Sequence, residues 1–114
     1  MADTISTPAP VMPMAVWSED LIFSALADPV RRKLLFALAR GGPQPASKLK
    51  AVAGRRLDAT LKQLVTLRAA GLLVTTPDPQ DGRRMFYALA PTVPVAKTET
   101  GVVIDFGFCR LRPA

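Results

Sequence analysis

The sequence contains no histidine and a single cysteine, Cys109, among its 114 residues. One cysteine excludes a disulfide bond within the chain, and a zinc cluster of cysteine and histidine ligands cannot be built. A histidine-based catalytic triad is excluded as well. A Gly-rich phosphate loop and a suitably placed carboxylate pair are also missing, so the sequence offers no enzyme site. We therefore expect no enzymatic activity, no cofactor and no metal.

Long hydrophobic runs are missing too. No run approaches the roughly 18 apolar residues that a membrane-spanning helix requires. Residues 1–16 carry an acidic residue, Asp3, near their start and are interrupted by Pro8, Pro10 and Pro13, which does not fit a signal peptide. We expect this segment to be a flexible tail, and we expect the protein to be cytoplasmic and to make no membrane contact.

What the chain does contain is positive charge, and it is unevenly distributed. Residues 21–90 carry twelve Lys and Arg against four Asp and Glu, a net charge of +8, whereas residues 1–20 carry −3 and residues 91–114 carry +1. A local excess of this kind attracts the phosphate backbone of a nucleic acid. The alternative is that these side chains only solvate helices. The length and the 49% hydrophobic content indicate one globular domain.

The pattern of apolar residues predicts four helices. Ser18 and Asp28 are good N-cap residues, and Pro29 suits the first helical position. The helices are expected from near Ser18 to the Asp28-Pro29 break and over residues 29–40, 45–52 and 57–70. The residues expected to face inward are, in chain order, Leu21, Ala25 and Leu26; Val30, Leu34, Leu35 and Leu38; Ala46, Leu49 and Val52; and Leu57, Leu61, Leu64 and Val65.

Extended segments follow the helices. Residues 73–76 and 85–89 are predicted strands around the loop 77–84, where Asp81-Gly82 is a favoured hairpin pair. Residues 102–111 alternate and predict one further strand, with Val102, Ile104, Phe106 and Phe108 on one face. The predicted fold is mainly α with a small β-sheet (α+β): a tail over 1–16, a winged helix-turn-helix over 17–90 and a C-terminal β extension over 91–114.

In such a fold the helix at 57–70 would enter the DNA major groove, and the loop at 77–84, the wing, would contact the backbone or the minor groove. Long polar side chains near the start of this helix are suited to base edges. An ordinary solvated helix face and a merely charged turn are the alternatives. The expected DNA contacts are Arg55, Arg56, Ala59, Thr60, Lys62 and Gln63 from the recognition helix and its turn, Lys48 and Lys50 from the third helix, and Arg83 and Arg84 from the wing.

Three segments resemble the ArsR/SmtB-type family of winged-helix repressors. ALADPVRRKLLFALARGG at 25–42 is similar to the entry into the second helix, LDATLKQLVTLRAAGLL at 57–73 to the recognition helix, and GRRMFYAL at 82–89 to the wing and its returning strand. The resemblance covers about 70 of the 114 residues. It implies a DNA-binding transcription factor that dimerises on a roughly palindromic operator.

The sequence also departs from this family. The recognition helix of the family usually carries Ser-x-His-Leu, whereas here the matching positions read Leu61, Lys62, Gln63 and Leu64. Metal-sensing members have paired cysteines on the third helix, or Asp and His on a C-terminal helix. Neither set is present in this sequence, so we do not expect metal sensing.

The expected function is sequence-specific binding of double-stranded DNA by a homodimeric transcriptional regulator, most simply a repressor. The alternative is a winged-helix protein–protein interaction module without specific DNA binding. Cys109 is expected to be a small buried apolar residue. The alternative is a thiol near the dimer axis that oxidises to an intermolecular disulfide bridge, with Arg110 lowering its pKa. The residues expected at the dimer interface are Trp17, Leu21, Ile104, Phe106 and Phe108.

Overall fold

Side-chain caps start the first two helices, as predicted. In the computed structural model, which describes residues 17–113, Ser18 Oγ accepts a hydrogen bond from the Leu21 N–H at 3.3 Å, and α1 runs over Glu19–Leu26. Asp28 Oδ1 accepts a hydrogen bond from the Val30 N–H at 2.7 Å, and α2 runs over Pro29–Gly41. The expected tail at 1–16 lies outside the described residues.

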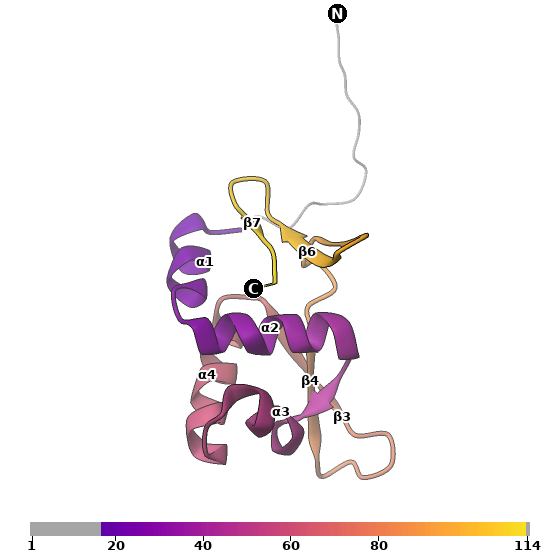
Figure 1. The fold of residues 1–114 in the computed structure, drawn as a ribbon. Coiled ribbons are helices and arrows are strands. Elements are labelled where there is room, and N and C mark those ends of the chain that lie inside the picture. Colours follow the sequence, from indigo (N-terminus) through magenta and orange to yellow (C-terminus); the bar gives the residue numbers. More distant parts are fainter. Residues whose placement is uncertain (1–16, 114) are drawn as a thin grey trace, which may run out of the picture.

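The next two helices form the helix-turn-helix. Helix α3 (Ala46–Ala53) ends at Gly54, whose φ of 63° lies in the left-handed region that glycine adopts without strain. Helix α4 (Leu57–Ala69) follows after a short turn. Figure 1 shows α2 across the middle of the molecule, with α3 and α4 on one side of it and α1 on the other.

A three-stranded antiparallel sheet, in the order β2-β4-β3, completes the winged domain. Strand β3 (Leu73–Pro77) pairs with β4 (Met85–Leu89), and the register sets Leu73 opposite Leu89. Both strands were predicted. Strand β2 (Gln44–Pro45) was not, because two residues are too few to show a periodic pattern.

The core lies between the helices and the sheet, and α2 contributes the most residues to it. On α2 the buried positions of the predicted pattern are confirmed. The largest side chains that are fully buried are Ile22, Leu34, Leu35, Leu49, Leu64, Leu67, Leu72, Ile104 and Thr60.

The predicted inward faces of α1 and α4 were wrong at three positions. Leu21 is 54% exposed, Leu57 43% and Val65 57%, whereas the neighbouring Ile22 and Leu64 are fully buried. Helix α4 buries the series Thr60, Leu64 and Leu67, spaced four and three residues apart, so Val65 turns to solvent. Leu57 is on the face of this series but is the first residue of the helix. The Thr60 hydroxyl donates to the Arg56 carbonyl oxygen at 2.9 Å, which allows this polar residue to be buried.

The C-terminal extension is a second three-stranded sheet rather than one strand. Its order is β5-β6-β7, from Val95–Thr98, Gly101–Asp105 and Arg110–Leu111. The single strand predicted over 102–111 was wrong, because the chain reverses between Asp105 and Arg110. Gly107 has a φ of 94° there, and its N–H donates to Asp105 Oδ1 at 2.8 Å.

No helix within residues 17–113 is long and apolar enough to cross a lipid bilayer.

The neighbouring residues Leu64 and Val65 test which face of α4 is buried. We predict that Leu64→Ala lowers the free energy of unfolding by about 2–5 kcal/mol, because it leaves a cavity in the core. Val65→Ala, at a solvent-facing position, should change it by less than about 0.5 kcal/mol. Urea denaturation followed by circular dichroism measures both. Similar losses for the two variants would contradict the observed helix register.

Candidate nucleic-acid interface

Exposed positive side chains gather at one end of the fold. Helices α3 and α4 and the loop between β3 and β4 lie at the lower end in Figure 1, away from the C-terminal sheet. This arrangement brings together seven exposed cations that the sequence analysis selected: Lys48, Lys50, Arg55, Arg56, Lys62, Arg83 and Arg84.

The turn between α3 and α4 is hollowed. An open depression of about 530 Å³ is lined by Ser47 and Lys50 of α3 and by the turn residues Gly54, Arg55 and Arg56. Its cations are exposed, and Arg56 Nε lies 3.7 Å from Asp58 Oδ1 in an ion pair whose side chains are 90% and 73% exposed. Pairs of this kind contribute little stability in water. Arg56 can therefore exchange its carboxylate partner for a phosphate at low cost.

Helix α4 does not present all of its predicted base contacts to solvent. Lys62 is exposed and Ala59 is half-buried. Thr60 is fully buried and its hydroxyl is bonded to the backbone, so the expected base contact from Thr60 was wrong. Sequence reasoning missed Val65, which is exposed one helical turn beyond Lys62. The exposure of Val65 follows from the burial of Thr60, which turns Asp58, Lys62 and Val65 outward together.

Gln63 is held by Arg31, a contact that the sequence did not reveal. Arg31 Nη1 donates to Gln63 Oε1 at 2.8 Å, Arg31 Nη2 donates to the Ser24 carbonyl oxygen at 3.1 Å, and Arg31 Nε donates to the Ala25 carbonyl oxygen. A bidentate contact with adenine requires both the oxygen and the nitrogen of the Gln63 amide. Gln63 would therefore have to release Arg31 before it could bind adenine in this way.

The wing is stabilised by its own carboxylates. Asp78 is 9% exposed, and its Oδ1 accepts a hydrogen bond from the Gln80 N–H at 2.8 Å. Arg84 Nε lies 3.9 Å from Asp78 Oδ2, while Arg83 Nε lies 3.4 Å from Asp81 Oδ1. The Arg83 side chain is 94% exposed, so it is the wing cation that most easily reaches a phosphate.

The residues expected at the dimer interface are in different environments. Ile104 is fully buried within the chain, so its assignment to the dimer surface was wrong. Trp17 packs edge-on against Phe106 at 5.2 Å, and Phe106 stacks on Phe108 at 6.0 Å. Leu21 is exposed at the surface of α1.

Phe23, which the sequence analysis did not select, is 50% exposed and contacts the Phe108 ring edge-on at 5.5 Å. The remaining exposed apolar surface of this region therefore comes from Leu21 and Phe23, beside the half-buried Phe108.

Cys109 is half-buried, and burial raises the pKa of its thiol, with further contributions from the negative charges of Asp105 and Glu19. The expectation that Arg110 lowers this pKa was wrong. Arg110 Nη2 instead pairs with Asp105 Oδ2 at 3.1 Å, and hydrogen bonds from Gly107 and Arg110 lower the pKa of the Asp105 carboxyl. A raised pKa keeps the thiol protonated and makes Cys109 a poor nucleophile.

Comparison with known proteins agrees with this geometry. A helix-turn-helix domain profile, HTH_20, matches residues 26–76. No curated protein matches the sequence. Among solved structures, one described as a probable transcriptional regulator from Pseudomonas aeruginosa is 25% identical, with a TM-score of 0.54, over 63% of this chain and 57% of its own. The chain thus spans little more than half the length of that protein.

Two further structures are more similar in sequence. An ArsR family transcriptional regulator is 34% identical, with a TM-score of 0.53, over 61% of this chain and 68% of its own. The cadmium metal sensor CmtR from Mycobacterium tuberculosis is 36% identical, with a TM-score of 0.53, over 64% of this chain and 72% of its own. With these identities and a shared helix-turn-helix and wing, the chain belongs to the ArsR family of winged helix-turn-helix proteins, a family of transcriptional regulators.

Proposed function

We propose that this regulator binds a specific double-stranded DNA operator as a homodimer and represses transcription from it. The observation that carries the proposal is the group of seven exposed cations on α3, on α4 with its preceding turn, and on the wing. In this arrangement α4 lies in the major groove, and the wing follows the backbone or enters the minor groove.

The cations divide into those that contact phosphates and those that reach base edges. Lys48, Lys50 and the wing arginines contact phosphates, which supplies affinity without sequence preference. Arg55, Arg56 and Lys62 lie at or near the start of α4, where base edges are within reach. Val65 adds an apolar contact suited to a thymine methyl group.

The dimer is inferred from the surface of α1, which lies on the other side of α2 from α3 and α4. Leu21 and Phe23 are exposed large apolar side chains on either side of the buried Ile22, and Phe23 lies beside Phe108, so α1 offers apolar surface to a second copy. A two-fold pairing through α1 presents two copies of α4 to half-sites about one helical turn apart. The winged helix-turn-helix domain Mb0332 from Mycobacterium bovis, 26% identical over 68% of this chain and 76% of its own with a TM-score of 0.54, is described as homodimeric.

The assignment as a repressor is supported by a similar structure. BigR from Xylella fastidiosa, described as a transcriptional repressor, is 26% identical with a TM-score of 0.53 over 61% of this chain and 67% of its own. A dimer that occupies a promoter-proximal operator blocks transcription without a further contact. A regulator of this kind acts inside the cell.

Operator binding is tested by titrating the protein against a fluorescent duplex from its own upstream region and against a scrambled duplex at two salt concentrations. We predict a preference of about a thousandfold or more for the native duplex. Arg83→Gln should weaken binding to both duplexes and reduce the salt slope by about one unit for each protomer of the dimer. Lys97→Gln, on exposed β5, removes one charge away from the interface and should leave the slope unchanged. Equal, weak binding to both duplexes would favour a protein-interaction module instead.

Substitutions at Thr60 and Gln63 distinguish a buried residue from one that contacts a base. Thr60→Val should leave the operator preference unchanged. It should lower the free energy of unfolding by only about 1 kcal/mol, because the backbone N–H of residue 60 still donates to the Arg56 carbonyl oxygen at 2.9 Å. Gln63→Ala should change the preference at one base pair by about 1–3 kcal/mol if Gln63 reads adenine. Binding to an operator set with single-base changes measures both. An equal loss on every sequence would show that Gln63 only positions α4.

The dimer is tested at α1. We predict that the double variant Leu21→Glu/Phe23→Glu is monomeric, because two carboxylates would be buried unpaired at the interface. Val95→Glu alters an exposed apolar residue on β5 and should leave the dimer intact. Light scattering coupled to size-exclusion chromatography gives the mass of each protein. A monomeric wild-type protein at tens of micromolar would refute the dimer.

A further inference from the structure

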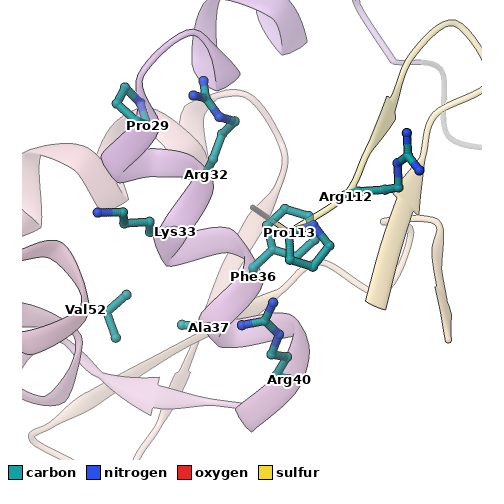
Figure 2. Close-up of a pocket in the computed structure, with 9 residues that line it drawn as sticks. All are labelled: Pro29, Arg32, Lys33, Phe36, Ala37, Arg40, Val52, Arg112 and Pro113. Carbon is teal, nitrogen blue, oxygen red and sulfur yellow. The ribbon is translucent and has the colours of Figure 1, made fainter. Parts of the chain in front are cut away.

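A cavity of about 450 Å³ lies between α2 and the C-terminal segment, apart from the α3–α4 turn and the wing. Figure 2 shows its α2 side chains projecting from successive turns of one helix, with Arg112 and Pro113 approaching from the C-terminal segment and Val52 from α3. This volume lies in the range of small-molecule sites, about 300–1,000 Å³. Nothing in the DNA-binding arrangement uses this cavity.

The spacing of residues along α2 explains why several of its side chains line the cavity together. Arg32, Lys33, Phe36 and Arg40 line the cavity, and residues three or four positions apart share one face of a helix. This face is adjacent to the one that buries Leu34, Leu35 and Leu38 in the core. This stripe could not be recognised from the sequence, because the C-terminal segment that covers it is remote along the chain.

The cavity combines an apolar floor with a positive rim. Phe36 is only 6% exposed, and Val52 and Pro113 extend this apolar surface. Arg40 lies over the Phe36 ring, with its guanidinium carbon 5.8 Å from the ring centroid. A flat apolar group beside Phe36 would therefore also lie beside a guanidinium.

The rim carries four cations, Arg32, Lys33, Arg40 and Arg112, and no acidic residue of the described part of the chain lines the cavity. None of the four forms an ion pair with a carboxylate within residues 17–113, whereas Arg31, Arg56, Arg83, Arg84 and Arg110 all do. Arg32 Nη1 donates to the Leu26 carbonyl oxygen, which fixes the Arg32 guanidinium at the edge of the cavity. Four cations without a described carboxylate create a potential that favours an anion.

We propose that this cavity binds a small organic anion with a flat apolar body, such as a one- or two-ring aromatic carboxylate. The ring lies against Phe36, Val52 and Pro113, and the carboxylate pairs with the arginines at the rim. Such a ligand would join the C-terminal segment to α2 and α3. A nucleic-acid phosphate fits the cations but leaves the concave apolar floor without a role.

The test is a titration of ¹⁵N-labelled protein with 2-naphthoate, followed by amide chemical shifts. We expect saturable shifts at residues 32–40 and 112. In the Arg40→Gln/Arg112→Gln variant the dissociation constant should rise by about tenfold or more, as expected when charge-assisted contacts are lost. Arg110→Gln is the matched control, because Arg110 lies two residues from Arg112 but does not line the cavity. Its dissociation constant should remain at the wild-type value.

Three results would overturn the proposal. The uncharged 2-naphthamide could bind as tightly as 2-naphthoate, which would remove the role of the cations. The double variant could bind 2-naphthoate as tightly as the wild type. A scrambled DNA duplex could shift the same amides and displace 2-naphthoate, which would make this surface part of the nucleic-acid path. None of these outcomes depends on operator recognition, so this inference and the proposed function fail separately.

Discussion

One guanidinium, that of Arg31, holds the three helices that position the candidate interface. It donates hydrogen bonds to the carbonyl oxygens of Ser24 and Ala25 in α1, lies 3.7 Å from the cap carboxylate of Asp28, and binds Gln63 on α4. Carbonyl groups in the last turn of a helix lack partners within it and carry partial negative charge, so a cation there is stabilising. Because the Arg31 side chain is only 17% exposed, its contacts are weakly screened by water. Arg31 thus links α4 to the end of α1 and the start of α2.

Structural features that depend on residues close together in the sequence were predictable. The caps at Ser18 and Asp28, the left-handed turn at Gly54 and the hairpin from β3 to β4 each depend on residues a few positions apart. The buried face of α4 was not predictable in the same way. Leu64 was predicted inward correctly and Leu61 is partly buried against the core, whereas Leu57 and Val65 are exposed and Thr60 and Leu67 are buried in addition. Packing against the neighbouring elements selects among these residues, so the expected base contact from Thr60 could not be corrected from the sequence.

Arginines of this chain show how one residue type serves different purposes according to burial. Arg31 lies inside the fold and is satisfied by carbonyl groups, Arg83 is almost fully in water, and Arg40 covers a phenylalanine ring. The net charge of +8 over residues 21–90 is thus a sum over unlike environments. This explains why charge alone indicated a nucleic-acid partner but could not separate the cations of the candidate interface from those that surround the cavity on α2.

Trp17 is the only tryptophan, and its ring lies 5.2 Å from Phe106, 89 positions further along the chain. Contacts between such distant positions form late in folding, because a long loop must close before they contribute. The helices α1 to α4 and the β3–β4 hairpin depend on shorter loops, so they can assemble earlier. Trp17 also lies beside Gly71, at the end of α4. The intrinsic fluorescence of the protein therefore reports, without any attached dye, the assembly of the C-terminal turn and the end of α4 around the start of α1.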